Sequence, residues 1–183
     1  LCQSVSQHLS KYDIEISAEN IVIAPGCKQA VLYAMLATLD VGDEVILLAP
    51  AWPSYDGMLK LLGAVPIHVP VRRDNYHPDF AAIENAITKK TKAIMINSPN
   101  NPTGAVYTPD EVQRLVKIAE DHDLWIIDDM IYASLVWEDY GYTSPMTCEG
   151  GEERTITIGG WSKGWAMTGW RMGWIGGNKE VID

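Results

Sequence analysis

Short apolar runs rich in β-branched residues alternate with helical segments along most of this chain, and that alternation strongly constrains its fold. Seven runs have the length and composition of buried strands. They span residues 20–24, 44–49, 65–71, 92–97, 124–128, 154–158 and 171–176. Because helical segments separate most of these runs, the strands must pair through crossovers. We therefore predict an α/β fold with three layers, in which helices cover both faces of a mostly parallel, seven-stranded sheet.

Two segments, 32–39 and 112–119, repeat apolar residues at i, i+3, i+4 and i+7, as on the buried face of a helix. Two more helices are predicted at 53–62 and 78–87. The helix that contains 112–119 has a clear start, because Thr108 and Glu111 form a capping box. Pro109 would occupy its first position, where the missing N–H costs nothing.

Composition excludes several classes of function. The chain has 14 Lys and Arg against 24 Asp and Glu, a net charge of −10, which argues against a nucleic-acid partner. Its longest strongly apolar stretch, 45–52, contains a proline and is too short to cross a bilayer. Cys2, Cys27 and Cys148 are widely spaced and match no disulfide or zinc pattern, which favours reduced thiols in a cytoplasmic protein.

Ligands of open α/β sheets bind outside the carboxyl ends of the strands, so the residues that follow each strand are the candidates for chemistry. The first strand runs into Gly26, Cys27 and Lys28 at a helix start, where free N–H groups bind anions such as phosphate. A simple helix cap is the alternative. After the second strand, Trp52 stands next to Pro53 and could stack on a planar ring or only pack in a loop.

Two further segments follow predicted strands. Residues 97–104 form a stiff loop rich in Asn and Pro that can present an amide to a ligand, although plain turn chemistry is the alternative. Asp128 and Asp129 end the fifth strand and should point to opposite sides. We expect one of them to be poorly solvated and to need a cation or several donors, unless it caps a turn.

The segment 159–174 contains four of the seven tryptophans and five glycines around Lys163 and Arg171. Such a pattern is not typical of a solvated surface. A lysine enclosed by aromatic rings is desolvated, which favours the neutral amine as a nucleophile toward carbonyl carbon. The segment therefore predicts a reactive lysine.

Together these segments resemble the fold-type I pyridoxal-phosphate enzymes, specifically the class I and II aminotransferases of the aspartate aminotransferase kind. The resemblance extends over essentially the whole chain and keeps the family's order. The matching motifs are Gly-Cys-Lys at 26–28, Pro-Ala-Trp at 50–52, Ser-Pro-Asn-Asn-Pro-Thr-Gly-Ala-Val-Tyr at 98–107, Asp-Asp-Met-Ile-Tyr at 128–132 and Ser-Lys-Gly-Trp-Ala-Met-Thr-Gly-Trp-Arg-Met-Gly at 162–173.

The resemblance implies a role for each matching residue. Lys163 would form the Schiff base with pyridoxal phosphate and later move the proton between the substrate and the cofactor. Asp129 would pair with the pyridinium nitrogen, which must stay protonated for the ring to withdraw electrons. Tyr132 and Asn101 would hydrogen-bond the phenolic oxygen of the ring, and Trp52 would stack on its face.

The resemblance also implies a phosphate site. Arg171 would grip the phosphate through its planar fork, together with the backbone amides of Gly26, Cys27 and Lys28. The Ser162 hydroxyl is the remaining member of that set.

Two positions depart from common family patterns. Gly160 stands where some members carry the phosphate-binding serine. Met130 stands where the commoner motif has Glu, and we expect it to point outward and leave cofactor binding intact.

The resemblance identifies residues 1–183 as the family's large, cofactor-binding domain. The chain has no initiating Met or secretory signal, and nothing in it matches the family's N-terminal segment or C-terminal small domain, so we expect a fragment. As such it should hold the cofactor but transaminate poorly. Large domains of this family pair about a two-fold axis, which implies a homodimer.

Three classes of function remain open at this stage. The first is an aminotransferase that moves an amino group between an L-amino acid and a 2-oxo acid. The second is a C–S β-lyase or an aminocyclopropane-carboxylate synthase, which use the same cofactor core. The third is a catalytically incomplete cofactor-binding domain, such as the effector domain of a bacterial transcription regulator, against which the negative charge argues.

Overall fold

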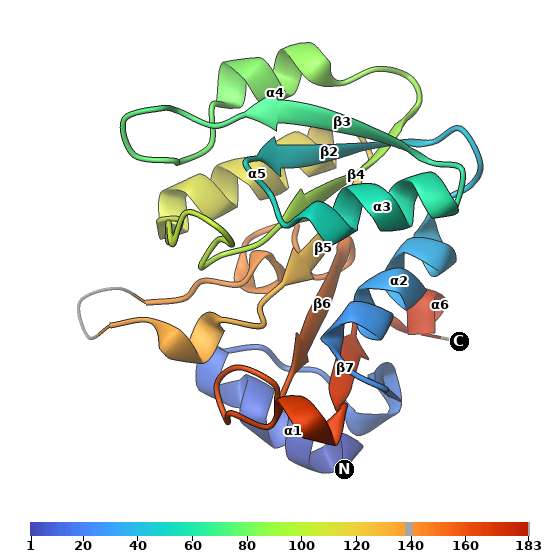
Figure 1. Cartoon of the computed structure of the whole chain (residues 1–183), viewed down its shortest axis with the longest axis vertical. Coiled ribbons are helices and arrows are strands. Elements are labelled where there is room, and N and C mark those ends of the chain that lie inside the picture. The colour runs from blue at the N-terminus through green and yellow to red at the C-terminus, as the bar shows by residue number, and fades with distance from the viewer. Residues whose placement is uncertain (138–140, 183) are drawn as a thin grey trace.

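A computed structural model describes residues 1–137 and 141–182 of the chain, whose core is a single seven-stranded sheet (Figure 1). The strand order is β1-β7-β6-β5-β4-β2-β3. The strands are β1 (Ile21–Ala24), β2 (Glu44–Ala49), β3 (Val65–Pro70), β4 (Thr91–Ile96), β5 (Trp125–Asp129), β6 (Thr155–Gly160) and β7 (Gly173–Gly176). Only β7 runs antiparallel to its neighbours, β1 and β6. The prediction of a mostly parallel, seven-stranded sheet is confirmed.

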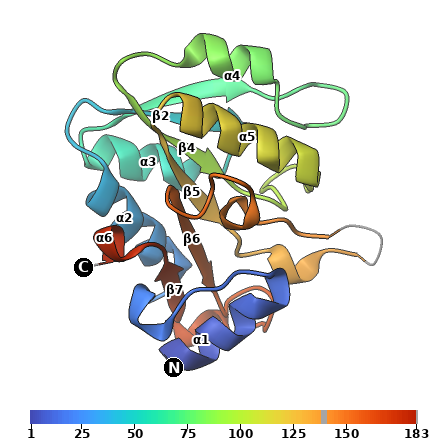
Figure 2. The same ribbon diagram turned by 180° about the vertical axis from the view of Figure 1, so that it is seen from behind.

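Helices cover both faces of the sheet, as the two opposite views show (Figures 1 and 2). One face carries α2 (Cys27–Thr38) and α3 (Pro53–Leu61), and the other carries α5 (Pro109–Asp121). The remaining helices are α1 (Cys2–Leu9), α4 (Phe80–Ala86) and α6 (Lys179–Ile182). The sequence patterns did not predict α1 or α6, which are short and offer few periodic apolar positions.

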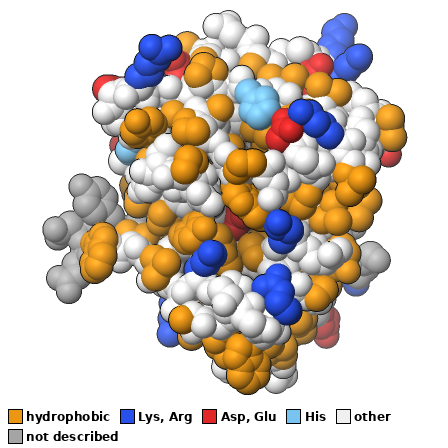
Figure 3. All heavy atoms as spheres, viewed as in Figure 1, with side chains coloured by type: hydrophobic (Ala, Val, Ile, Leu, Met, Phe, Trp, Pro, Cys, Tyr) orange, Lys and Arg blue, Asp and Glu red, His pale blue; other side chains and the backbone are white. Residues whose placement is uncertain are grey.

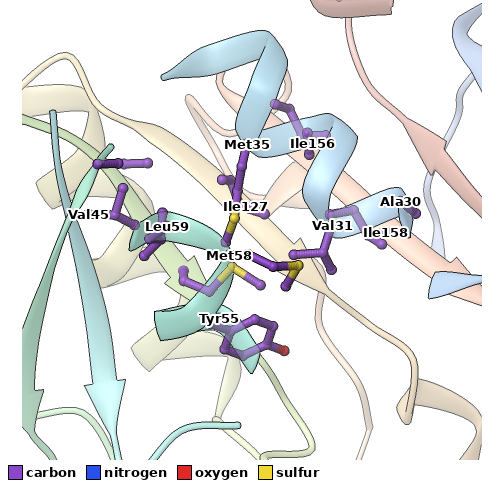
Figure 4. Close-up of a cluster of buried hydrophobic side chains, with 14 of the residues drawn as sticks. Ala30, Val31, Met35, Val45, Tyr55, Met58, Leu59, Ile127, Ile156 and Ile158 are labelled. Carbon is purple, nitrogen blue, oxygen red and sulfur yellow. The ribbon is translucent and has the colours of Figure 1, made fainter. Parts of the chain in front are cut away.

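Alternation along each central strand divides the core into two clusters. In β2, Val45 and Leu47 belong to the cluster under α2 and α3, whereas Ile46 and Leu48 belong to the cluster under α4 and α5. Figure 4 shows the first cluster, where side chains from α2 and α3 meet those of the sheet. Because both faces are buried, these strands read as continuous apolar runs.

A third cluster lies under α1, where Val5 and Leu9 pack with Met130 and Trp174. Our expectation that Met130 points outward was wrong, because the residue is only 4% exposed and packs in this cluster. The residue follows β5, and the thioether accepts a hydrogen bond from the Thr157 hydroxyl. Met130 therefore joins the end of β5 to the α1 layer.

One predicted strand begins two residues later than expected. Arg171 has a left-handed backbone (φ +50°), so the chain becomes extended only at β7, which begins at Gly173. That bend turns the arginine toward the carboxyl edge of the parallel strands.

The described residues contain no helix that is long and apolar enough to span a bilayer. Within the same residues no group of His, Cys, Asp and Glu is arranged to hold a metal ion. Cys2, Cys27 and Cys148 are all free thiols.

The predicted capping box at the start of α5 is present, and it allows a first test. The Thr108 hydroxyl accepts from the Glu111 N–H, and the Glu111 carboxylate accepts from the Thr108 N–H. We expect Thr108→Ala to lower the free energy of unfolding by about 1 kcal/mol, measured by urea denaturation. Thr108→Ser keeps the hydroxyl and should cost much less, and an equal loss in both variants would contradict the capping role.

Candidate active site

The carboxyl ends of the parallel strands and the start of β7 surround a cavity of about 250 Å³. In the space-filling view, basic side chains gather around a hollow on this face (Figure 3). Nine of the ten residues predicted for the site line the cavity. They are Cys27, Lys28, Trp52, Asn101, Asp129, Tyr132, Ser162, Lys163 and Arg171. The tenth, Gly26, lies against the Arg171 guanidinium.

The carboxylate of Asp129 forms the buried end of the cavity, with only 2% of the residue exposed. The Tyr55 hydroxyl donates to its Oδ2 at 2.6 Å. Its Oδ1 accepts from the Ile131 N–H at 3.2 Å and from the Cys27 thiol at 3.6 Å. Both oxygens are therefore partnered, as a buried carboxylate requires.

The electrostatics of this group follow from its burial. Burial raises the pKa of Asp129, and the hydrogen bonds from Tyr55, Ile131 and Cys27 oppose that rise. Burial and the neighbouring carboxylate raise the pKa of both Tyr55 and Cys27 well above their ordinary values. Both groups therefore keep their protons at neutral pH and remain available as donors to Asp129.

Two asparagines connect the loop after β4 to the end of β5. The Asn97 side chain donates to the backbone carbonyl of Asp129 at 2.8 Å and accepts from the Asn101 N–H at 2.8 Å. Burial and the Asp129 carboxylate raise the pKa of Tyr132, and the nearby Asn101 side chain opposes that rise. Asn101 and Tyr132 therefore present a neighbouring amide and phenol to the cavity.

An aromatic wall forms after β2. The ring of Trp52 meets that of Tyr55 edge to face, with centroids 5.2 Å apart. The Lys28 ammonium lies 4.9 Å from the centroid of the Trp52 ring. Trp52 thus lines the cavity and is not a simple core residue.

The start of α2 and the turn before β7 form an anion cradle. Gly26 has φ +99°, and a Cβ built there would lie 2.4 Å from Arg171 Nη2, so only glycine admits the guanidinium so closely. Gly173 likewise allows β7 to pass directly against the backbone of Cys27. The Arg171 fork, fixed by a 2.9 Å bond from Nη1 to the Thr168 carbonyl, therefore lies beside the first N–H groups of α2.

The prediction that aromatic rings enclose and desolvate Lys163 was wrong, as far as the described residues show. Lys163 is exposed, and its ammonium lies 5.9 Å from the centroid of the Tyr132 ring. The tryptophans do not enclose it, since Trp165 meets His8 edge to face, Trp161 and Trp174 pack in the cluster under α1, and Trp170 is 68% exposed. Their clustering in the sequence reflects the α1 layer more than the lysine.

Sequence reasoning missed the residues that hold the site residues in place. Tyr55 and Asn97 bind Asp129, and Thr168 holds Arg171. The sequence did contain signals that could have identified Tyr55 and Asn97. A buried tyrosine hydroxyl on α3 needs a polar partner, and Asn97 directly follows an apolar strand.

Comparison with known proteins agrees with this geometry. A family model described as aminotransferase class I and II matches residues 1–183. The chain belongs to this family. It is 43% identical over 170 residues to a probable aspartate/prephenate aminotransferase of Thermus aquaticus, covering 92% of this chain and 44% of the relative. It is 40% identical over 172 residues to an aspartate aminotransferase of Thermotoga maritima, covering 93% and 45%.

Solved structures of family members share the fold. An aspartate aminotransferase from Thermus thermophilus with maleate superposes with a TM-score of 0.94 at 38% identity, covering 99% of this chain and 47% of that one. An N-succinyldiaminopimelate aminotransferase from Mycobacterium tuberculosis gives a TM-score of 0.96 at 31% identity, covering 99% and 48%. The chain thus spans about half the length of the aminotransferases it matches.

The close approach of Gly26 and Arg171 allows a test with a matched pair of variants. Gly42 also has a positive φ, +92°, but has open space around it. We expect Gly26→Ala and Gly42→Ala each to destabilise the fold by about 1–2 kcal/mol, because alanine is strained at positive φ. Only Gly26→Ala should also weaken binding of pyridoxal phosphate, measured by quenching of tryptophan fluorescence, since it displaces Arg171. Equal affinities in the two variants would contradict the cradle.

Proposed function

We propose that this chain carries the pyridoxal-phosphate site of an aminotransferase that moves an amino group between an L-amino acid and a 2-oxo acid. One observation supports this most strongly. A buried carboxylate, a lysine amine and an arginine beside a helix start converge from separate strands on one cavity. Family membership supports the same reaction class.

The residues of the cavity fit this cofactor. Asp129 offers a buried negative charge for a protonated ring nitrogen, and the cation would offset the cost of burying the carboxylate. The start of α2 and Arg171 offer a phosphate site. When bound, pyridoxal phosphate supplies an electron sink for the bonds at the α-carbon of the substrate.

Each residue then has a defined task. Lys163 would hold the cofactor through its amine and, once the substrate has displaced that amine, would move a proton at the substrate α-carbon. Asp129 would hold a proton on the ring nitrogen of a bound cofactor, and Tyr132 and Asn101 would hydrogen-bond its ring oxygen. Trp52 would stack on one face of the ring and exclude water from it.

We infer that an amino acid with a carboxylate in its side chain is the first substrate to test. The Thermus aquaticus and Thermotoga maritima relatives are named for aspartate, and the Thermus thermophilus structure contains maleate, a dicarboxylate. In this chain the Lys28 ammonium lies at the Trp52 wall and lines the same cavity, so it offers a positive charge to such a side chain. Amino-group transfer from aspartate, compared with alanine and phenylalanine in the same assay, tests the preference.

The attachment of the cofactor can be tested directly. With pyridoxal phosphate the chain should develop a visible absorbance band, and borohydride reduction followed by peptide mapping should place the adduct on Lys163. Lys163→Ala should abolish the band, while Lys89→Ala, which changes an exposed lysine outside the cavity, should leave it unchanged. Adducts spread over surface lysines in the unaltered chain would refute the proposed site.

We also propose that the protein is a homodimer in the cytoplasm. The surface exposes large apolar side chains, including Trp137 at 85% and Trp170 at 68%. Sedimentation equilibrium should therefore give twice the chain mass of 20.3 kDa. A monomer at micromolar concentration would contradict the dimer and leave the proposed chemistry untouched.

A further inference from the structure

A second buried acid, Asp128, lies next to Asp129 and has no part in the proposed reaction. The two residues end β5 and alternate across the sheet, so Asp128 does not line the cavity. We expected one of the two acids to be poorly solvated, and both are: Asp128, like Asp129, is buried. Two adjacent negative charges in this environment would repel one another strongly.

The hydrogen bonds of Asp128 are unevenly distributed. The hydroxyls of Tyr142, Ser144 and Thr157 all lie within hydrogen-bond distance of Oδ2. Its Oδ1 is buried and has no partner among the described residues. An ionised carboxylate shares its charge over both oxygens, so leaving one of them unpartnered is costly.

The chemistry of the neighbours distinguishes the two acids. A hydroxyl both donates and accepts, so a proton on Asp128 Oδ2 would find an acceptor among its three hydroxyl neighbours. The Ile131 N–H beside Asp129 can only donate, so Asp129 Oδ1 must remain an acceptor, and its Oδ2 accepts from the Tyr55 hydroxyl. Both oxygens of Asp129 are thus partnered, which suits a carboxylate, whereas Asp128 has one unpartnered oxygen and only hydroxyls around the other, which suits a neutral acid.

We propose that Asp128 is a neutral carboxylic acid in the folded protein, so that only one of two adjacent buried acids ionises. Its link to the cofactor rests on the proposed function. A single ring cation compensates a single buried charge, and a neutral Asp128 removes the repulsion that would oppose ionisation of Asp129.

The titration of Asp128 agrees with this assignment. Burial, the largest influence, raises the pKa of Asp128 to about 7; Asp129 adds to the rise, and the bonds from Tyr142, Ser144 and Thr157 oppose it. The charge of Asp128 in turn contributes to the raised pKa values of Tyr142 and Cys148, which burial raises most. Tyr142, Cys148 and Asp129 are the titratable groups coupled to Asp128 in the described part of the chain.

Infrared spectroscopy of the cofactor-free chain tests the proposal. At about pH 5 the unaltered protein should show a C=O stretch from a buried carboxylic acid, and Asp128→Asn should remove that band. Asp110→Asn, which changes an exposed acid, should leave the band unchanged. Tyr142→Phe should shift the band and not remove it, because one hydroxyl partner is lost. If Asp128→Asn removes no such band, Asp128 is ionised and the proposal fails.

The pH dependence of stability provides a second test. An acid whose folded-state pKa is raised from 3.8 to about 7 holds its proton more tightly in the folded state. Its contribution to the free energy of unfolding is therefore largest below about pH 4 and is lost as the pH rises to about 7. The free energy of unfolding is measured against pH for the unaltered chain and for Asp128→Asn. The difference between the two curves should isolate this fall, since Asp129 is present in both proteins. A difference that is flat or rises with pH would overturn the proposal.

These experiments need no cofactor, so they separate this proposal from the proposed function. If the adduct on Lys163 is found but the infrared band is absent, only the role of Asp128 fails. If the band is present but no adduct forms, Asp128 is the neutral acid and the cofactor assignment fails. If both the adduct and the infrared band are found, the Asp128→Asn variant should bind pyridoxal phosphate with a dissociation constant within about twofold of that of the unaltered chain, because the amide is also neutral. A loss of tenfold or more would show that Asp129 depends on an ionised Asp128.

Discussion

The burial of the Asp129 carboxylate at the end of β5 is the constraint on which the rest of the site depends. A buried carboxylate must be partnered, and its partners come from three places: Tyr55 on α3, Cys27 at the start of α2 and the Ile131 N–H just beyond β5. Asn97 holds the backbone of the same residue from the loop after β4. Satisfying one charge therefore fixes the relative positions of three strand ends, and the cavity is a consequence of that arrangement.

The antiparallel strand β7 completes the arrangement in a way that parallel strands cannot. Because it begins at the edge where its neighbours end, it brings the residues before it, including Arg171, to the cavity. Two glycines make the approach possible, Gly26 under the guanidinium and Gly173 against the start of α2. The anion site thus depends on backbone geometry as much as on the arginine.

Sequence reasoning predicted the elements whose signals are local. The capping box at Thr108 and the apolar alternation of β2 are set by neighbouring residues, and both are present. Sequence reasoning failed where tertiary packing determines whether a side chain is buried or exposed. Met130 is buried because α1 covers the end of β5, and Lys163 is exposed because three of the four tryptophans around it pack toward α1 and Trp170 faces solvent. No local sequence pattern predicted that Met130 and the tryptophans would pack against α1. None predicted that the Tyr55 hydroxyl would donate to Asp129.

The two acids at the end of β5 show how a small change in surroundings separates chemical roles. Both are buried and adjacent, but Asp129 has a partner at each oxygen, including an N–H that can only donate, whereas Asp128 has hydroxyls at one oxygen and no described partner at the other. Alternation along the strand produces this difference, since it sends one side chain into the cavity and the other toward the loop that carries Ser144. A shift of one residue in β5 would exchange the two environments. The register of this strand therefore determines which acid carries the charge, and sheet pairing and site chemistry are set by the same constraint.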